Sequence, residues 1–481
     1  MKKNGTTNSG FMYNIEIENG GIAEAVARLS QANDYADLYL QAGVGHSVLF
    51  EEGRMDTLSS SRSDGLGVRI LRGGDTIYAH TSGTDGLAVN KGLAEAVRLA
   101  GLDLHFPAFG AKAVLDAGAT LPPLDVSFFH DIDRQLRGEC SWLRQLSMRY
   151  RTSSKVVLVV RGDGSVACDE RVYTTFAASV VLEKDGDLQT GYEARSLLCC
   201  VADFWGQGES EDSEREACTA LDVARAALSR GLLMLEAIPC PAGTMPVVMD
   251  GSAGGTMIHE ACGHGLEADI VQKDYSVFRD RIGQRVAPEG VTIVDDATLP
   301  GLYGSYRFDD EGTPAQRTVL VENGILKNYL TDILSAREGN LPLSGNGRRE
   351  SYQHQPIPRM SNTFIENGES SREEILAGVK QGLLVRKMGG GEVDPTSGDF
   401  VFFVSEGYLV EDGRVGRAVK GATLTGNGPE ALERIEAVGR ELCFDPGTCG
   451  KSGQGVPVSD GQPTLLIGSL IVGGSDAGEC G

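Results

Sequence analysis

The chain changes character at the stretch Pro239-Cys240-Pro241-Ala242-Gly243. Before it, amphipathic helical patterns alternate with strand-like runs. After it, glycine becomes frequent, helical patterns become scarce and short strand-like runs recur. Closely spaced proline and glycine interrupt regular structure, and 481 residues are too many for one hydrophobic core. We therefore expect an α+β protein with an N-terminal mixed α/β domain at 1–238 and a C-terminal β-rich domain, barrel- or sandwich-like, at 239–481.

Hydrophobic periodicity predicts the elements of both domains. In the N-terminal domain we expect antiparallel strands together with helices, the last of them with a serine and glutamate capping box at 213 and 216. The predicted helices are 22–32, 86–100, 131–151 and 213–237, and the predicted strands are 36–41, 47–51, 65–71, 76–79, 155–160, 171–182 and 187–196. In the C-terminal domain we expect helices at 371–381 and 429–438 and strands at 291–295, 316–322, 325–330, 399–411, 414–423 and 464–472. Asn323-Gly324 and Asp412-Gly413 predict two-residue hairpin turns.

Charge and cysteine content limit the classes of function. A net charge of −23 argues against binding to nucleic acid or to an anionic membrane, because phosphate contacts need clustered Lys and Arg. No apolar run is long enough to cross a bilayer, and the first ten residues lack the apolar core of a secretory signal. Ten cysteines without framework spacing are typical of reduced thiols. We therefore expect a cytoplasmic protein without nucleic-acid or membrane partners.

One stretch of the C-terminal half, VVMDGSAGGTMIHEACGHGLEAD at 247–269, has the composition of a metal site. It runs from a short apolar strand through a glycine turn into a predicted helix that carries His259, Glu260 and His264. Two neutral imidazoles suit a zinc ion, and a neighbouring carboxylate can deprotonate a metal-bound water. The alternative is a helix N-terminus with Glu260 in its first turns and two hydrogen-bonded histidines.

The spacing of the two histidines predicts a distorted helix. In the common H-E-x-x-H pattern the histidines are four residues apart and share one helix face. Here they are five apart, which on a regular helix turns the second by roughly 140° from the first. A π-bulge would bring positions five apart back onto one face. Gly263 and Gly265 favour such a distortion, so we predict an irregular turn at 261–265.

A catalytic zinc needs a third protein ligand, which the residue pattern alone leaves open. The candidates are His354 in a polar segment, Cys449 in a glycine-flanked loop beside Lys451, and Cys262, which is less plausible because it would share the arc between the two imidazoles. Two other polar clusters permit simpler interpretations. We expect the acidic run 309–312 to be a solvated turn. Arg348, Arg349 and Arg359 are candidates either for binding a peptide carboxylate or for ordinary surface charge.

Long blocks of the C-terminal half resemble the TldD branch of the TldD/PmbA family, the branch that retains the metal motif. The blocks are HEACGHGLEAD at 259–269, RRESYQHQPIPRMSNTFIENG at 348–368, GGGEVDPTSGDFVF at 389–402 and CGKSGQGVPVSDGQPTLLIGSLIVGG at 449–474. The resemblance covers nearly the whole chain and implies a cytosolic zinc metallopeptidase. It implies that His259, His264 and Cys449 bind Zn²⁺ and that Glu260 is the catalytic base.

The resemblance also implies a substrate class and a partner. Proteins of this branch pair with a TldE/PmbA-type paralogue and process unfolded peptides, so we expect a peptide or unfolded-protein substrate and a dimer, either with such a paralogue or with itself. Two other functions stay open at this point. One is a peptide-binding or chaperone-like subunit with a structural zinc, and the other is a thiol-dependent redox protein.

Overall fold

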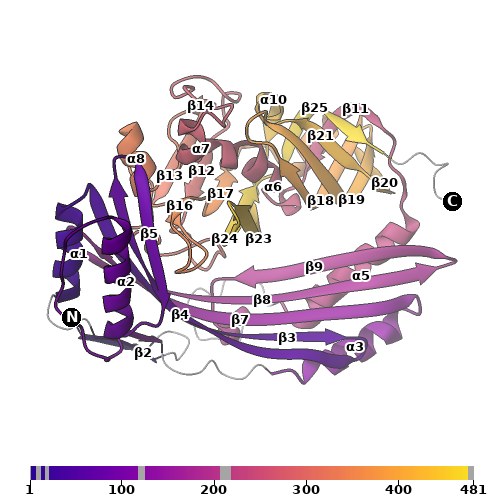
Figure 1. The fold of residues 1–481 in the computed structure, drawn as a ribbon. Helices are drawn as coiled ribbons and strands as arrows, with labels where there is room; N and C mark the ends of the chain where they lie inside the picture. The colour runs from indigo at the N-terminus through magenta and orange to yellow at the C-terminus, as the bar shows by residue number, and fades with distance from the viewer. Residues whose placement is uncertain (1, 7–11, 17–20, 118–124, 206–217, 475–481) are drawn as a thin grey trace.

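The structure is a computed structural model that describes residues 2–6, 12–16, 21–117, 125–205 and 218–474. It is mixed α/β, and Figure 1 shows a long, curved sheet formed by the N-terminal half below two smaller sheets of the C-terminal half. No helix in this described part combines the length and the hydropathy needed to cross a membrane.

The N-terminal half is built on one six-stranded antiparallel sheet. Its strand order is β5-β4-β3-β7-β8-β9, and the strands are β3 (Tyr35–Glu51), β4 (Arg54–Arg72), β5 (Asp75–Ser82), β7 (Leu143–Arg161), β8 (Val166–Lys184) and β9 (Asp187–Leu197). A separate small sheet joins β1 (Lys2–Thr6), β2 (Met12–Glu16) and β6 (Leu115–Ala117). The first two predicted strands, 36–41 and 47–51, are one continuous strand, β3, because the chain between them pairs with β4 and β7 along its whole length.

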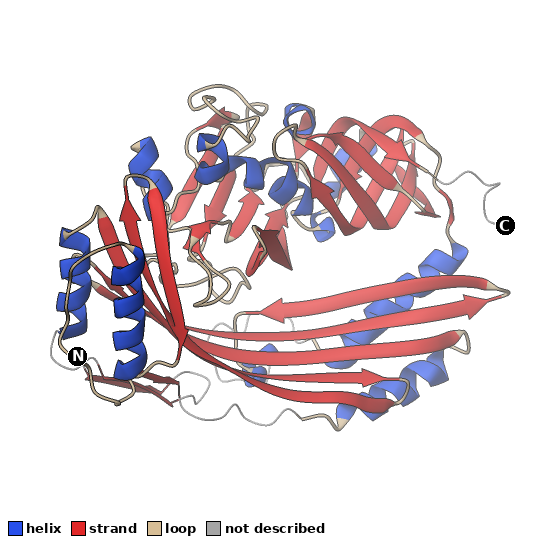
Figure 2. Ribbon diagram, in the orientation of Figure 1, coloured by secondary structure: helices blue, strands red, loops and turns tan. Residues whose placement is uncertain are grey.

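Two pairs of helices cover the ends of the long sheet and create two separate cores. One core lies under α1 (Gly21–Gln31) and α2 (Gly86–Leu99), and the other lies under α3 (Phe128–Glu139) and α5 (Ala220–Glu236). Figure 2 shows these helices at opposite ends of the sheet. Helix α4 (Val201–Phe204) adds Phe204 to the second core.

Two helix predictions need comment. The predicted helix 131–151 is wrong in its second half, because the chain leaves the helix at residue 139 and enters β7 at 143. Leu146, Met148 and Tyr150 are buried at alternate positions there, which is the period of a strand. The predicted capping box at 213 and 216 lies outside the described residues. The described helix α5 begins with a capping box formed by Thr219 and Asp222.

A closed five-stranded barrel forms one part of the C-terminal half. It joins β11 (Gly243–Met249), β18 (Gln381–Val393), β19 (Asp399–Glu411), β21 (Thr423–Asn427) and β25 (Leu465–Gly473), and the β19–β21 pairing closes the ring. Only the β11–β18 pair of the ring is parallel. Strands β10 (Ile238–Pro239), β20 (Arg414–Lys420) and β22 (Ile435–Val438) attach to its rim. The expected β-rich, barrel-like architecture is thus confirmed.

A second six-stranded sheet lies beside the barrel. Its order is β14-β13-β12-β17-β24-β23, and its strands are β12 (Ile293–Asp296), β13 (Arg317–Glu322), β14 (Ile325–Leu326), β17 (Asn362–Ile365), β23 (Cys443–Lys451) and β24 (Gln454–Gln462). The predicted turns at Asn323-Gly324 and Asp412-Gly413 are confirmed, with positive φ at all four residues. The remaining elements are short, namely α7 (Ala268–Gln272), α8 (Ile333–Gly339), α9 (Arg372–Ala377), α10 (Gly428–Glu433), β15 (Gly347–Arg348) and β16 (Ile357–Pro358).

Buried charges join the long sheet to the C-terminal half. Arg69 on β4 pairs with Asp37 on β3 and, at 2.5 Å, with Glu311 of the C-terminal half, and all three side chains are fully buried. Arg171 on β8 likewise pairs with Asp310 at 2.9 Å. The prediction of a solvated turn at 309–312 is therefore wrong, because Asp310 and Glu311 are buried as partners of arginines on the long sheet, and the buried Asp309 accepts backbone hydrogen bonds from Glu311, Thr313 and Gly347.

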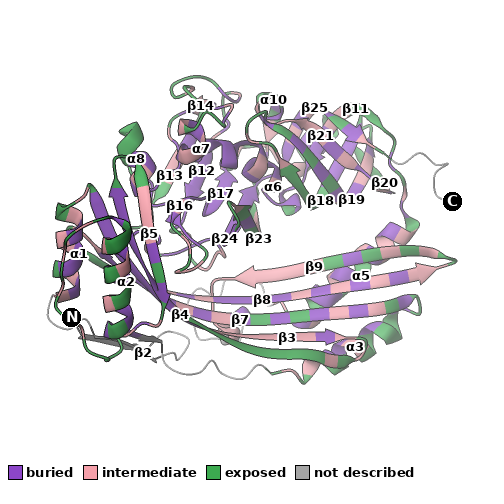
Figure 3. Ribbon diagram, viewed as in Figure 1, coloured by how far each residue is buried: buried purple, intermediate pink, exposed green. Residues whose placement is uncertain are grey.

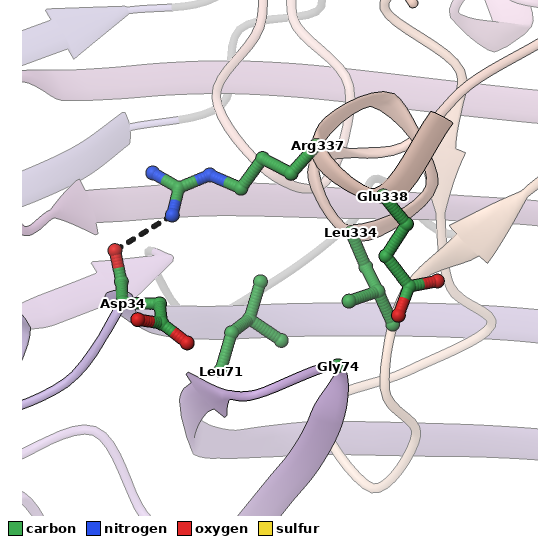
Figure 4. A pocket seen from close by; sticks show the side chains of 6 residues that line it. All are labelled: Asp34, Leu71, Gly74, Leu334, Arg337 and Glu338. Carbon is green, nitrogen blue, oxygen red and sulfur yellow. Dashed lines mark hydrogen bonds between the residues drawn. The ribbon is translucent and has the colours of Figure 1, made fainter. Parts of the chain in front are cut away.

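A pocket of about 360 Å³ lies at the same junction. It is lined by Asp34, Leu71, Gly74, Leu334, Arg337 and Glu338. Figure 4 shows Arg337 of α8 reaching across it to donate to the backbone carbonyl oxygen of Asp34, at 2.6 Å. Residues 35–43 of β3 and 156–160 of β7 are buried, whereas the first half of β4 is largely exposed (Figure 3).

Candidate metal centre

The helical segment between the barrel and the second sheet carries both histidines. It begins as α6 (Thr256–Ile258), widens into a π-helical turn at His259–Gly263 and tightens into a 3-10 turn at His264–Leu266. The backbone N–H of His264 donates to the carbonyl oxygen of His259, five residues earlier, which defines the π turn. The predicted irregularity is confirmed and begins two residues earlier than expected. The two imidazole rings lie 4.9 Å apart at 88°.

Close packing explains the glycine inside the π turn. A Cβ on Gly263 would lie 2.1 Å from the sulfur of Met360, a fully buried residue just before β17. A Cβ on Gly428, at the start of α10, would lie 2.3 Å from the carbonyl oxygen of Ala261. The widened turn therefore fits between a methionine from the sheet side and a glycine from the barrel side. This packing fixes the direction in which the two imidazoles point.

Cys449 meets the two histidines from the other side. It lies on β23, and its Sγ is 3.5 Å from Nε2 of His264. One donor atom each of His259, His264 and Cys449 lies within 4.8 Å of the other two, and all three residues are buried. No other group of three His, Cys, Asp or Glu residues in the described part of the chain is arranged to hold a metal.

The other two candidates for the third ligand, Cys262 and His354, form hydrogen bonds elsewhere. The Cys262 thiol donates to the carbonyl oxygen of Ile258, at 3.2 Å. His354 forms a hydrogen bond through Nδ1 with the Ser351 hydroxyl, at 3.0 Å. The structure therefore leaves Cys449 as the candidate that lies beside both histidines.

Two buried carboxylates orient the imidazoles. Nδ1 of His259 donates to Oδ1 of Asp460 on β24 at 2.7 Å, and Nδ1 of His264 donates to Oε2 of Glu267 at 2.9 Å. Because a carboxylate can only accept here, both rings present Nε2 to the space between them. Such carboxylate partners fix the tautomer of metal-binding histidines. The sequence interpretation missed both acids. Glu267 follows His264 by three residues and could have been suspected, but nothing local marked Asp460.

Glu260 occupies the position expected of a base. Its Oε2 lies 4.0 Å from Nε2 of His264, and its side chain is 20% exposed, twice the exposure of the His264 side chain. Burial raises the pKa of this carboxyl, and the two histidines partly offset the increase. A carboxylate with a raised pKa is a better proton acceptor in a general-base step.

The electrostatics of the cluster favour a thiolate. Burial alone would raise the pKa of Cys449, but His259 and His264 outweigh burial and hold it well below its usual range. Burial also disfavours the charged form of His264, yet Glu267 and Cys449 raise its pKa to about 9. Two imidazoles and a thiolate are the donor types that zinc prefers. The chemistry of this donor set therefore fits a zinc ion.

The three arginines considered for substrate binding are structural. Arg348, Arg349 and Arg359 are all at most 2% exposed. Arg359 donates to the carbonyl oxygens of Cys449 and Gln454, at 2.5 and 3.1 Å. Neither a surface role nor a role in binding a peptide carboxylate is compatible with guanidinium groups that are buried and bonded to the chain in this way.

Comparison with known proteins identifies the family to which this chain belongs. The family model described as the PmbA/TldA metallopeptidase C-terminal domain matches residues 242–474, and the model described as the PmbA/TldA metallopeptidase domain 1 matches residues 36–101. A Haemophilus influenzae protein named metalloprotease TldD homolog is 37% identical over 457 residues, which cover 92% of this chain and 93% of that protein. The chain belongs to the TldD/PmbA family of metallopeptidases.

Solved structures share the fold of this TldD/PmbA protein. A Thermotoga maritima structure superposes with a TM-score of 0.72 at 20% identity and covers 94% of this chain and 99% of that one. The structure of TldE from Thermococcus kodakarensis gives a TM-score of 0.67 at 16% identity and covers 93% of this chain and 100% of that one. The long sheet and the β-rich C-terminal half are thus the common architecture of these proteins.

Proposed function

We propose that this TldD/PmbA family protein is a zinc-dependent peptidase that hydrolyses unfolded or extended peptides. His259, His264 and Cys449 would hold the zinc ion, and Glu260 would be the base. One observation carries the proposal: two imidazoles from a π turn and a thiol 185 residues further along the chain bring their donor atoms within 4.8 Å, next to a carboxylate that reaches solvent.

Three protein donors favour a catalytic over a structural zinc. Structural zinc sites are closed by four protein ligands, whereas catalytic sites use three and keep one position for water or substrate. The cluster in the described part of the chain consists of three donors. This count argues against the alternative in which the protein is a peptide-binding or chaperone-like subunit with a structural zinc.

In the mechanism that we propose, different residues of the site bind the metal, transfer the proton and orient the imidazoles. Zinc, when bound, would polarise the scissile carbonyl and acidify a water molecule. Glu260 takes the proton of the attacking water on its carboxylate and then delivers it to the departing amine. Asp460 and Glu267 keep Nε2 of the two imidazoles turned into the site. Within this largely buried cluster, the Glu260 side chain is the one most accessible to water.

The edge of the second sheet suggests how an extended peptide is held. β23, which carries Cys449, is the terminal strand of its sheet and pairs only with β24 in the described part of the chain. A free strand edge can add an extended peptide by backbone hydrogen bonds, which gives affinity with little dependence on sequence. The substrate would thus be a peptide without tertiary structure.

The partner and the compartment are part of the same proposal. The similarity to a TldE structure supports a dimer, either with a TldE/PmbA-type paralogue or with a second copy of this chain. The ten cysteines, which lack the spacing of a disulfide framework, support a reducing, cytoplasmic location. Neither nucleic acid nor membrane is proposed as a partner.

The test combines metal content with peptide cleavage, measured with and without a co-expressed partner subunit. Glu260→Gln should keep one zinc per site and lose cleavage by about 10²- to 10⁴-fold, because it removes only the proton acceptor. Cys449→Ser should lose the zinc. Cleavage by Glu260→Gln at the wild-type rate, or a full zinc complement in Cys449→Ser, would contradict the assignment. Alkylation-sensitive activity that persists after chelation would favour a thiol-dependent redox protein instead.

A further inference from the structure

Lys451 links the two segments that carry the proposed metal ligands. It lies on β23, two residues after Cys449, and its side chain is only 9% exposed. Its Nζ lies 3.1 Å from Oε2 of Glu267 and 2.6 Å from Oδ1 of Asp269, and it donates to the carbonyl oxygen of Pro358 at 3.1 Å. Three acceptors therefore surround one buried ammonium group.

Glu267 is the acid that orients His264, and it depends on this lysine. Its side chain is fully buried, and its Oε2 is shared between Nδ1 of His264 and Nζ of Lys451. Within the described part of the chain, no other Lys or Arg lies within ion-pair distance of Glu267. A buried carboxylate without a cation is costly to maintain in its charged form. Lys451 is therefore the nearest cation that stabilises the charge of Glu267, and together with His264 it holds the orientation of this carboxylate.

The hairpin β23–β24 thus has a second role beside supplying a sulfur ligand. Its second strand carries Asp460, which holds His259 directly, and its first strand carries Lys451, which holds His264 through Glu267. Arg359 fastens the hairpin by donating to the carbonyl oxygens of Cys449 and Gln454. One rigid unit therefore contacts all three proposed ligands.

We propose that Lys451 is a positioning residue of the metal centre, which sets the orientation of His264 through Glu267 and the distance of Cys449 from it. This inference rests on the proposed function, because it assumes that the three residues bind zinc. Lys451 itself donates no ligand and takes no part in proton transfer. It affects the zinc affinity of the site and the geometry of the ligands around the metal.

The experiment measures zinc affinity by competition with a chromophoric chelator, using the full chain with its partner if one is required. Lys451→Met keeps most of the aliphatic stem and removes the charge. We expect its zinc affinity to fall by 10- to 100-fold, the usual loss when the hydrogen-bonding partner of a metal ligand is removed. In the cobalt-substituted protein, the absorption bands of the metal should shift, because the geometry of His264 and Cys449 changes. Lys451→Arg, which keeps the charge, should restore most of the affinity.

Lys420→Met is the matched control. Lys420 forms a more exposed ion pair with Asp187, at 2.9 Å, in a different part of the fold, so removal of its charge should leave affinity and spectrum unchanged. Glu267→Gln provides a second variant if Lys451→Met does not fold, and it should show the same loss and the same spectral shift.

The results separate a failure of the inference about Lys451 from a failure of the proposed function. Wild-type affinity and an unchanged cobalt spectrum in Lys451→Met would overturn the inference, as would a lower melting temperature of the metal-free protein with no change in affinity. Wild-type protein that binds no zinc would refute the proposed function instead.

Discussion

Gly263→Ala tests whether the packing of the π turn holds the two histidines in place. The added Cβ would lie 2.1 Å from the sulfur of Met360, whereas ordinary contacts between such atoms begin near 3.5 Å, so something must move by about 1.4 Å. Met360 is fully buried, so its side chain can move away only by displacing neighbouring core residues, and its backbone is held by a hydrogen bond from Arg348 to its carbonyl oxygen. Overpacking of this kind costs about 1–3 kcal/mol.

Gly138→Ala is a control that separates the overpacking cost at Gly263 from the general stabilising effect of alanine in a helix. Gly138 lies in α3, is exposed, and has nothing within 4 Å of the position that a Cβ would take. Replacing glycine by alanine inside a helix stabilises by about 0.5–1 kcal/mol. Gly263 has ordinary helical dihedrals, so it would gain the same amount if packing allowed. The difference between the two variants therefore equals the overpacking cost.

The assay is calorimetric unfolding of the metal-free proteins, followed by chelator competition for zinc. With about 2–4 °C per kcal/mol for a domain of this size, Gly263→Ala should melt roughly 2–12 °C below Gly138→Ala. It should also bind zinc more weakly, because the turn that aims His259 and His264 is displaced. If Gly263→Ala melts with Gly138→Ala and binds zinc as tightly as wild type, the reasoning about the π turn is refuted.

Three further predictions use other parts of the structure. Asp460→Asn removes the charge behind His259 and should weaken zinc binding by about 10- to 100-fold in chelator competition, with little effect on the unfolding of the metal-free protein. The pKa of His264 is raised to about 9 in the metal-free centre, and that of His259 is raised well above its ordinary value because Asp460 and Cys449 outweigh the effect of burial, so zinc must displace protons from these rings near neutral pH; affinity measured from pH 6 to 8 should therefore tighten by about tenfold per unit for each proton displaced, and a flat profile would contradict this. Arg69→Met removes the cation that pairs with the buried acids Asp37 and Glu311 and should destabilise by about 3–5 kcal/mol in thermal unfolding, whereas Arg62→Met, whose guanidinium is exposed, should cost less than about 1 kcal/mol.

The π turn could be predicted from the sequence because five-residue spacing and a shared ligand are incompatible on a regular helix. The hairpin turns could also be predicted from the sequence, because Asn-Gly and Asp-Gly favour the positive φ angles that a two-residue hairpin turn requires. The third ligand could not be predicted from the local sequence. Nothing in the residues around Cys449 shows that β23 lies beside a helix 185 residues earlier, and only the resemblance to a family singled it out.

Other errors have a common physical origin in tertiary contacts. The chain after residue 139 has a pattern that permits a helix, yet pairing with β3 and β8 makes it a strand. Arg359 and the acids 309–311 looked like surface groups because charge usually lies at the surface. Here each charge is neutralised or hydrogen-bonded by residues far away in the sequence, which a local pattern cannot show.

Because Cys449 lies near the C-terminal end of the chain, the proposed ligand set is completed late during synthesis. The histidines leave the ribosome 185 residues before this sulfur. At about 5–20 residues per second, that separation corresponds to roughly 10–40 s in which the growing polypeptide holds two imidazoles and a base but no complete ligand set. If the proposed peptidase activity requires the complete ligand set, this delay would keep the nascent chain, itself an extended peptide, from being cut by its own centre.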